Sequence, residues 1–532
     1  MTTPLLRHAK RRRVAAIDIG SNSIRQIVAD ISADGDIVVV DEMKAAPRLG
    51  TGIEKTGVLD DDAIERAVEA LDRMATLARR HGAERIDTVA TSAVRDATNA
   101  SEFVARVKAT TGLRIRVLDG AAEARLCFRS ALAHFELGVG RAVVMDIGGG
   151  SLELAASADG VVEHLASLPL GALRLTERFL SDGAGRKAVR KLRREVRRAL
   201  RPELPIRNWR GAQLIGSGGT FTNLAGMHLA RQGIQVARSV HGTSVPRVEL
   251  EHVLEMLAEM EPEERLHVEG LNPGRADIIV AGLAVAAEVM ARLDARNLVV
   301  SRYGIREGIL LEAARVRPTI ADPGEAHDRS ITDFAVRCHY EAAHAHTVQT
   351  LALALFDAIG LRIGCRPEDR RLLADAALLH DIGYHISYAR HHKHSYHLIL
   401  HADLLGMTPS DQVVVANVAR YHRRALPKKK HRNFGVLGPK LRARIKRLSA
   451  ILRLADGLDR GHVGAVASMK VRWMRRALRI TPVPARPSHS LRLEMWGAQR
   501  KSQLLADVIG VPVEIVAPDG SVLSSADLDD AK

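Results

Sequence analysis

Short apolar runs alternate with longer amphipathic segments through the first half of the chain. Two runs are alike: Ala15–Ile19 and Val143–Ile147 each carry one aspartate before the last residue, and a glycine follows each. Apolar runs of this length that end in a glycine turn are typical of buried strands. A second strand is predicted after each turn, over Arg25–Ile31 and Leu152–Ala156. The repetition predicts two copies of an α/β unit.

Helical periodicity follows the first pair of strands. Apolar residues recur every three or four positions between Asp61 and His81, which predicts an amphipathic helix that Asp60 caps. The same reasoning predicts further elements in both copies. They are a strand at Ile86–Ala90, a helix at Glu102–Thr111, a strand at Ile115–Leu118 and a strand at Gln213–Ile215.

The pattern changes beyond residue 316. Prolines and a glycine over 317–330 indicate a linker, and helical periodicity with many histidines follows it. After Trp473 the short alternating pieces Leu491–Met495 and Val511–Val516 suggest strands. We therefore predict α/β domains at 1–135 and 136–316, a linker at 317–330, an all-α domain at 331–472 and a small β-rich C-terminal domain at 473–532.

The amino-acid composition limits the classes of protein to which the chain can belong. The chain of 532 residues is 46% hydrophobic but only 3% aromatic, so it lacks the rings that bind single-stranded nucleic acid by stacking. No apolar stretch has the length of a membrane span, and the three cysteines are widely spaced, which favours a cytoplasmic protein. The net charge of +16 attracts polyanions of any kind. Nine of the sixteen residues in Arg186–Arg201 are basic, which indicates either a solvated face or a track for a polyanion.

Carboxylates and glycine turns at strand ends suggest chemistry. Asp18 and Asp146 end predicted strands beside such turns, and magnesium prefers carboxylate oxygens of this kind. Each glycine turn alone is typical of a structural turn, and an aspartate there can simply cap a helix. Three such turns together favour phosphate binding through backbone amides. The candidate phosphate-binding residues are Ser21, Asn22, Gly148, Gly149, Gly150, Ser151, Gly216, Ser217, Gly218, Gly219 and Thr220.

With these motifs the chain resembles the exopolyphosphatase/guanosine pentaphosphate phosphohydrolase family of the sugar kinase–actin-like superfamily. The matching motifs occur in the family's order and span about 300 residues. They are Asp18–Ser23, Thr91–Ala97, Gly120–Leu126, Asp146–Glu153, Gly216–Thr220 and Arg306–Gly308. The resemblance implies a duplicated ribonuclease-H-like α/β fold, magnesium-dependent hydrolysis of phosphoanhydride bonds in the cleft between the two halves, and a homodimer.

The resemblance also assigns roles to individual residues. It implies that Glu123 is the general base that activates water and that Arg95 contacts phosphate. It implies that Asp146 and Glu153, with Asp18, hold magnesium or order the water. The family usually has two adjacent glutamates where this chain has Ala122 and Glu123, so the role of Glu123 depends on matching it to the second of them.

The histidine-rich segment resembles HD-domain phosphohydrolases, whose ligands converge on one or two divalent metals. The matching phrases include Leu378–Gly383 and Leu454–Asp459. The resemblance implies a second divalent metal (Mn, Fe, Zn or Mg) at His344, His380, Asp381, His394, His422 and Asp456. A buried histidine on an apolar helix face is more often an ordinary core residue, and His391, His392 and His397 read as neighbours of the site.

These observations favour an exopolyphosphatase that acts on inorganic polyphosphate, with guanosine penta- or tetraphosphate as a further substrate. Three alternatives remain open at this stage. The first is an ATP-dependent phosphotransferase of the same superfamily, and the second is a regulator that binds polyphosphate or the guanosine nucleotides with weak activity. The third, a nucleic-acid-binding role, agrees with the charge, but the sequence contains no recognised DNA- or RNA-reading motif.

Overall fold

The computed structural model describes residues 11–32, 37–204, 209–234, 239–315, 323–402, 404, 406–487 and 490–521. The chain forms two compact units. The first comprises Met1–Ala230 and Val240–Pro323, and the second comprises Arg231–Ser239 and Gly324–Lys532. In the described part of the chain, no helix combines the length and the apolar character needed to cross a bilayer.

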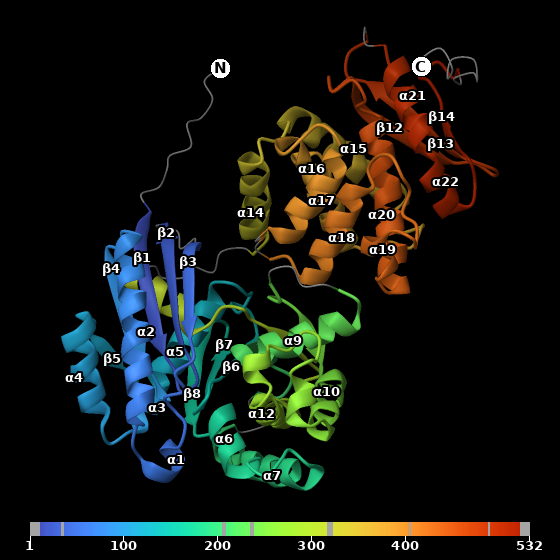
Figure 1. Cartoon of the computed structure of the whole chain (residues 1–532). Helices are drawn as coiled ribbons and strands as arrows, with labels where there is room; N and C mark the ends of the chain where they lie inside the picture. The colour runs from blue at the N-terminus through green and yellow to red at the C-terminus, as the bar shows by residue number, and fades with distance from the viewer. Residues whose placement is uncertain are drawn as a thin grey trace. The chain divides into compact units, whose positions relative to one another are not determined.

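The first lobe of the first unit is a five-stranded sheet with helices around it (Figure 1). Its strand order is β3-β2-β1-β4-β5; β1, β2 and β3 are antiparallel, and β4 and β5 run parallel to β1. The strands are β1 (Arg12–Ile19), β2 (Ile24–Ile31), β3 (Ile37–Ala45), β4 (Arg85–Ala90) and β5 (Ile115–Val117). The helices are α1 (Ile53–Thr56), α2 (Asp61–Arg80), α3 (Ser92–Asp96), α4 (Ala100–Thr111) and α5 (Gly120–Leu132).

The second lobe repeats this sheet with one added edge strand. Its order is β10-β11-β9-β6-β7-β8, in which β6 takes the place of β1. The strands are β6 (Arg141–Ile147), β7 (Leu152–Ala158), β8 (Val161–Leu168), β9 (Gln213–Ser217), β10 (Ser244–Pro246) and β11 (Asn297–Val300). The helices are α6 (Ala172–Phe179), α7 (Arg186–Glu203), α9 (Gly219–Arg231), α10 (Arg247–Glu259), α11 (Pro262–Arg265) and α12 (Ile279–Arg292). The last helix of the unit, α13 (Ile305–Ala313), packs on the first lobe, against β1, β2 and α5.

The duplication extends to the register of the first hairpin in each lobe. Asp18 on β1 pairs with Arg25 on β2, and Asp146 on β6 pairs with Glu153 on β7. The predicted α/β duplication is therefore confirmed, as are the strand at Gln213 and the helix that Asp60 caps, since the Asp60 carboxylate accepts a hydrogen bond from Ala63 N. Because the two lobes share one topology, both central strands deliver an aspartate to the same kind of sheet edge.

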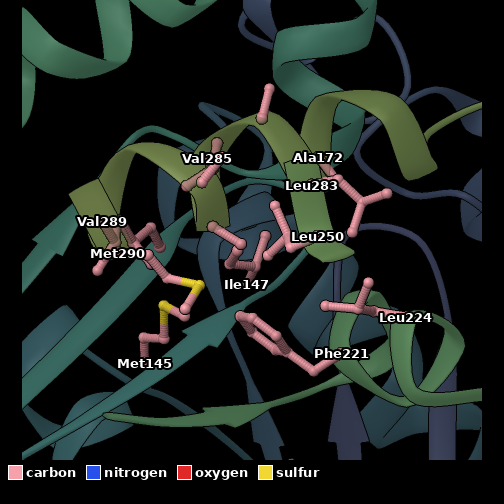
Figure 2. Close-up of a cluster of buried hydrophobic side chains, with 14 of the residues drawn as sticks. Met145, Ile147, Ala172, Phe221, Leu224, Leu250, Leu283, Val285, Val289 and Met290 are labelled. Carbon is pink, nitrogen blue, oxygen red and sulfur yellow. The ribbon is translucent and has the colours of Figure 1, made fainter. Parts of the chain in front are cut away.

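A dense apolar core holds the second of these strand ends in place. Figure 2 shows Met145 and Ile147 of β6 surrounded by side chains of α9, α10 and α12, including Phe221, Leu250 and Leu283. All five side chains are fully buried or nearly so. Asp146 lies between two anchored residues of a strand, and close-packed interiors of this kind resist displacement of the backbone.

The second unit begins with a helical part. Its helices are α14 (Pro323–Arg337), α15 (Ala342–Ile359), α16 (Asp369–Leu379), α17 (His391–His401), α18 (Pro409–Arg420), α19 (Arg432–Gly435) and α20 (Pro439–Gly457). The linker prediction for 317–330 is therefore wrong for its second half, where α14 lies, and 317–322 fall outside the described residues. A proline in the first turn of a helix costs no hydrogen bond, so Pro323 starts α14 where the composition suggested a break.

A three-stranded sheet of order β12-β13-β14 and two helices complete the unit. The elements are β12 (Val466–Trp473), β13 (Leu478–Pro484), α21 (Arg492–Lys501), α22 (Gln503–Ile509) and β14 (Val513–Ile515). The strand expected at Leu491–Met495 is helical instead. Leu491, Met495 and Ala498 are buried at helical spacing, whereas Leu493 is 49% exposed, so the apparent alternation was the start of a helical stripe.

Candidate active site

Residues from both lobes of the first unit line a single cleft. Asp18 comes from the end of β1, Glu123 from the first turn of α5 and Asp146 from the end of β6. The cleft also receives backbone from the turns that follow these strands and from the start of α9. The predicted site residues that line it are Asp18, Ser21, Asn22, Glu123, Asp146, Gly148, Gly149, Ser151, Ser217, Gly218 and Gly219.

The two strand-end aspartates are suited to a cation. Burial raises the pKa of Asp18 to about 6, although the positive charges of Arg25 and Arg306 act to lower it. Burial likewise raises the pKa of Asp146, although the Cys127 thiol donates a hydrogen bond to its Oδ2 at 3.2 Å. The Oδ1 atom of Asp18 is buried without a hydrogen-bond partner among the described residues. An unsatisfied buried carboxylate oxygen is costly, and a hard cation such as magnesium would satisfy it.

Glu123 has the environment of a general base. Arg95 Nη1 donates a hydrogen bond to its carboxylate at 3.0 Å, and Asp119, four residues before Glu123, caps the helix. Burial and the negative charges of Glu153 and Asp18 raise the pKa of Glu123 well above its ordinary value. A raised pKa makes the carboxylate a stronger base, and the positive charge of a bound cation would favour its ionised form.

Two predicted site residues lie behind the cleft lining. Arg95 contacts Glu123 and the Leu118 carbonyl. Glu153 accepts a hydrogen bond from Ser167 at 2.9 Å, and burial raises its pKa to about 8. Both side chains therefore act on residues that line the cleft, and neither lines it in this structure.

The glycine turns bring backbone from the two lobes close together. A Cβ on Gly149 would lie 3.1 Å from Asn22 N, and a Cβ on Gly150 would lie 2.4 Å from Ser92 Oγ. An added Cβ would clash with serine side chains at Gly150 and would force its neighbours to shift at Gly149, so the close approach favours glycine at both positions. Gly150, Gly216 and Thr220, which were predicted to bind phosphate, do not line the cleft. Gly216 packs against the Phe221 ring and Thr220 is fully buried, so these two shape the loop from beneath.

Gly218 gives a direct test of the loop geometry. Its φ is +94° and an added Cβ would lie 2.4 Å from Asp146 Oδ1. For the phosphohydrolase activity that the resemblance implies, we expect Gly218→Ala to lower phosphate release about 10- to 100-fold, because the methyl group displaces a carboxylate that must be positioned accurately. Gly211→Ala is the matched control, since Gly211 has a φ of +73° and open space around its Cβ. Equal kcat/KM values for the two variants would show that backbone strain alone explains the loss.

Sequence analysis missed three arginines of the cleft, Arg25, Arg275 and Arg302. Arg25 lies opposite Asp18 on β2, and Arg275 lies in a 3-10 turn (Pro273–Arg275) with its guanidinium against Gly219. Burial lowers the pKa of Arg25 and of Arg275, that of Arg275 to about 10, and neither of these two has a hydrogen-bond partner in the described part of the chain. Arg306, which the sequence left without a role, also lines the cleft. Buried cations that face a cavity without partners favour an anionic ligand.

The sequence contains a feature that could have identified one of these arginines as a site residue. The two α/β copies place Arg25 and Glu153 at the same offset from Asp18 and Asp146, so aligning the copies singles out Arg25. Arg275 had no such signal, because it reaches the cleft from an irregular segment far along the chain.

A second group of side chains meets in the helical part of the other unit. His344, His380 and Asp381 form one set of close donor atoms, and Asp381, His391 and His422 form another. His391 takes the place that was predicted for His394, which is not part of either set. His391 and Ser395 share the face of α17 that meets His380, since Ser395 Oγ donates to the His380 carbonyl at 2.7 Å. His394 is rotated off that face.

The remaining predicted ligand adjoins this group. Asp456 Oδ1 lies 3.8 Å from His344 Nε2, and the other Asp456 oxygen contacts the Lys501 ammonium. Asp459, to which no role was assigned, accepts a hydrogen bond from His344 Nδ1 at 2.8 Å. Burial lowers the pKa of His422 well below its ordinary value, so this imidazole is neutral and can act as a ligand.

The topology and the cleft define a class of protein: two α/β lobes of one topology, with strand-end carboxylates and glycine loops at the cleft that both lobes line. Within this class, the chain belongs to the Ppx/GppA phosphatase family. The family's phosphatase domain matches residues 27–316, and its domain III matches residues 327–481.

Similar proteins cover a little over half of the chain. Exopolyphosphatase 2 of Mycobacterium tuberculosis is 38% identical over 321 residues, which are 57% of this chain and 98% of that protein. The crystal structure of the Aquifex aeolicus Ppx/GppA family member covers 57% of this chain and 98% of its own, at 30% identity and a TM-score of 0.51. An exopolyphosphatase structure from Cytophaga hutchinsonii covers 58% of this chain and 99% of its own, at 27% identity and a TM-score of 0.54.

Proposed function

We propose that this chain is an exopolyphosphatase that releases terminal orthophosphate from inorganic polyphosphate in the cleft of its first unit. The observation that carries the proposal is the meeting of Asp18, Glu123 and Asp146 in one cleft with glycine loops from both lobes. Membership of the Ppx/GppA family and the likeness to named exopolyphosphatases support the choice of substrate.

The proposed reaction uses each group for one task. Asp18 and Asp146 would hold magnesium, with Glu153 behind them, and the cation would neutralise charge on the phosphate. Glu123 takes a proton from a water molecule as that water attacks the terminal phosphorus. The bond between this phosphorus and the bridging oxygen breaks, and the shortened chain leaves with that oxygen. Phosphoryl transfer depends mainly on positioning and charge neutralisation, for which Arg25, Arg275 and the loop amides are suited.

Guanosine pentaphosphate is the second candidate substrate, because the resemblance found in the sequence implies it beside polyphosphate. A phosphotransferase and a weakly active binding protein are the competing proposals. Orthophosphate release from long-chain polyphosphate, guanosine pentaphosphate and ATP separates them when each is assayed alone with magnesium. We expect release from polyphosphate without any nucleotide. Release that requires a nucleotide would contradict the proposal, and so would polyphosphate binding without turnover.

The basic helix α7 is less free to bind a polyanion than its sequence suggested. Arg193 pairs with Glu251 at 2.8 Å and with Glu288 at 2.5 Å, and Arg197 pairs with Glu288 at 2.6 Å. These contacts use part of the positive charge to join α7 to α10 and α12. A track for long chains on this helix would use the exposed residues Lys187, Arg190 and Arg194.

We also propose that the helical part of the second unit is an HD-like domain that binds a divalent cation. The group formed by His344, His380, Asp381, His391 and His422 supports this proposal, with Asp456 beside it. Mixed imidazole and carboxylate donors suit manganese, iron or zinc better than magnesium.

A further inference from the structure

Arg174, on α6 of the second lobe, reaches two carboxylates of the first lobe. Its Nη1 donates a hydrogen bond to Glu54 of α1 at 3.0 Å, and its Nη2 donates to Asp96, the last residue of α3, at 2.5 Å. The Arg174 side chain is 17% exposed, whereas those of Glu54 and Asp96 are 33% and 35% exposed. A guanidinium that is divided between two carboxylates is held in one orientation, because its donors form a rigid plane.

The backbone of the same residue is fixed to the glycine turn that follows β6. The amides of Leu173 and Arg174 both donate hydrogen bonds to the Gly149 carbonyl, at 2.9 and 3.1 Å. Gly171, the residue before α6, packs directly on this turn, since an added Cβ would lie 2.3 Å from the carbonyl carbon of Gly150. Arg174 is therefore attached through its backbone to a loop of the cleft and through its side chain to the opposite lobe.

Asp96 lies between two guanidinium groups. Its Oδ2 accepts the hydrogen bond from Arg174, and its Oδ1 lies 3.7 Å from Arg95 Nε. Arg95 in turn donates a hydrogen bond to Glu123 at 3.0 Å. These contacts form a row of alternating charges that begins at α6 of the second lobe and ends at the proposed general base.

The position of Asp96 determines how Arg95 is shared. Carboxylates form strong hydrogen bonds with guanidinium groups, so Asp96 and Glu123 compete for the donors of Arg95. The contact with Arg174 holds one Asp96 oxygen away from Arg95, and the other oxygen lies beyond hydrogen-bond distance from Arg95 Nε. Without Arg174, the Asp96 carboxylate would be free to turn towards Arg95 and to draw it away from Glu123.

Two other contacts between the lobes do not belong to this row. Glu177 of α6 accepts a hydrogen bond from Gly52 N, at the start of α1, at 3.2 Å, and Glu54 on α1 pairs with Arg174. Among the described residues, neither glutamate forms a hydrogen bond or ion pair with Arg95 or Asp96. These contacts can hold α6 against α1, and they allow tethering of the lobes to be tested apart from positioning of the base.

We propose that Arg174 is a positioning residue for the hydrolysis, which restrains Asp96 and so keeps Arg95 on Glu123 while the glycine turn of the second lobe lies against the first lobe. The base is thereby oriented when the loop that would bind phosphate is in place. This inference rests on the proposed function, in which Glu123 is the general base, and it adds the residue that links the base to that loop.

Steady-state kinetics on a short polyphosphate of defined length test the link by double-mutant cycles. We expect Arg174→Ala to lower kcat about tenfold, because a small misplacement of the base slows the reaction by this order or more. The KM should stay near the parent value, since Arg174 does not line the cleft. In an Asp96→Asn background Arg174→Ala should change kcat less than about twofold, because the two residues act as one unit. In a Glu54→Gln background it should keep its full effect.

The controls separate this role from support of α6. Arg178→Ala is the matched control, since Arg178 lies one turn further along α6 and pairs with Glu195 of its own lobe at 3.6 Å, and it should keep the parent kcat. Arg174→Lys should recover part of the loss, because an ammonium keeps a positive charge for Asp96. Circular dichroism identifies any variant that does not fold, and the same cycles are run with Arg174→Gln where the alanine variant fails.

The outcomes distinguish this inference from the function beneath it. The parent kcat in Arg174→Ala, or the same loss from Arg174→Ala with and without Asp96→Asn, would overturn the positioning role alone. An equal loss in Arg178→Ala would overturn it too, because disturbance of α6 would then explain the effect. The parent kcat in Glu123→Gln, or no phosphate release by the parent, would overturn both the proposed function and this inference.

Discussion

The variant Glu123→Gln is expected to lose phosphate release from polyphosphate by about 10²- to 10⁴-fold in kcat, the range that a general base contributes. The amide keeps the size of the side chain and can still accept a hydrogen bond from Arg95, but it cannot take a proton from water. The KM for polyphosphate should change little, because the phosphate loops and the cleft arginines remain. Steady-state kinetics on long-chain polyphosphate with magnesium measure both parameters.

The stability of this variant should not fall. Burial raises the pKa of Glu123, so the ionised carboxylate is unfavourable in the folded cleft without a cation, and a neutral amide removes that cost. Glu102→Gln, on the exposed first turn of α4, is the matched control and should keep the parent kcat. A Glu123→Gln enzyme that turns over at the rate of Glu102→Gln would remove Glu123 from the reaction.

The variant Arg275→Ala is expected to lower kcat/KM for polyphosphate by about 10- to 100-fold, the effect of losing one or two charged hydrogen bonds to phosphate. The guanidinium packs against Gly219 at the start of α9, so it can reach the same anion as that loop. Arg275→Lys should recover part of the loss, because an ammonium keeps the charge but lacks the planar fork.

The unfolding temperature separates binding from structural support at this position. Burial of an arginine without a partner is unfavourable, so Arg275→Ala should leave the unfolding temperature unchanged or raise it. Arg210→Ala is the control, since Arg210 lies on the surface in an ion pair with Asp294. Equal kcat/KM for the Arg275 and Arg210 variants would exclude Arg275 from substrate binding.

The sequence predicted those parts of the site that are carried by regular elements. Asp18 and Asp146 end apolar strands, and Glu123 lies in the capped first turn of a helix, so local pattern and position along the chain sufficed to find them. Arg275 could not be found in this way, because it reaches the cleft from an irregular turn. The sequence also did not show that Arg95 and Glu153 lie behind the residues that line the cleft. Their position depends on the packing of α5 against the second sheet.

The histidines show a second limit of sequence reasoning. His391 and His394 lie three residues apart on α17, and both fit the spacing expected of a ligand. Only the tertiary contact of Ser395 with His380 determines which face of α17 meets the cluster. In the same way, alternation over Leu491–Met495 predicted a strand, but the burial of Met495 and Ala498 belongs to a helix that packs on α20.

The central claim is that phosphate release takes place in the cleft and not at the histidine cluster. Its most direct test is one assay of orthophosphate release from long-chain polyphosphate, with magnesium and without nucleotide, on Glu123→Gln and Asp381→Asn. The account predicts that Asp381→Asn keeps the rate of the parent while Glu123→Gln loses nearly all of it. Full activity in Glu123→Gln with loss in Asp381→Asn would contradict it and would move the chemistry to the second unit.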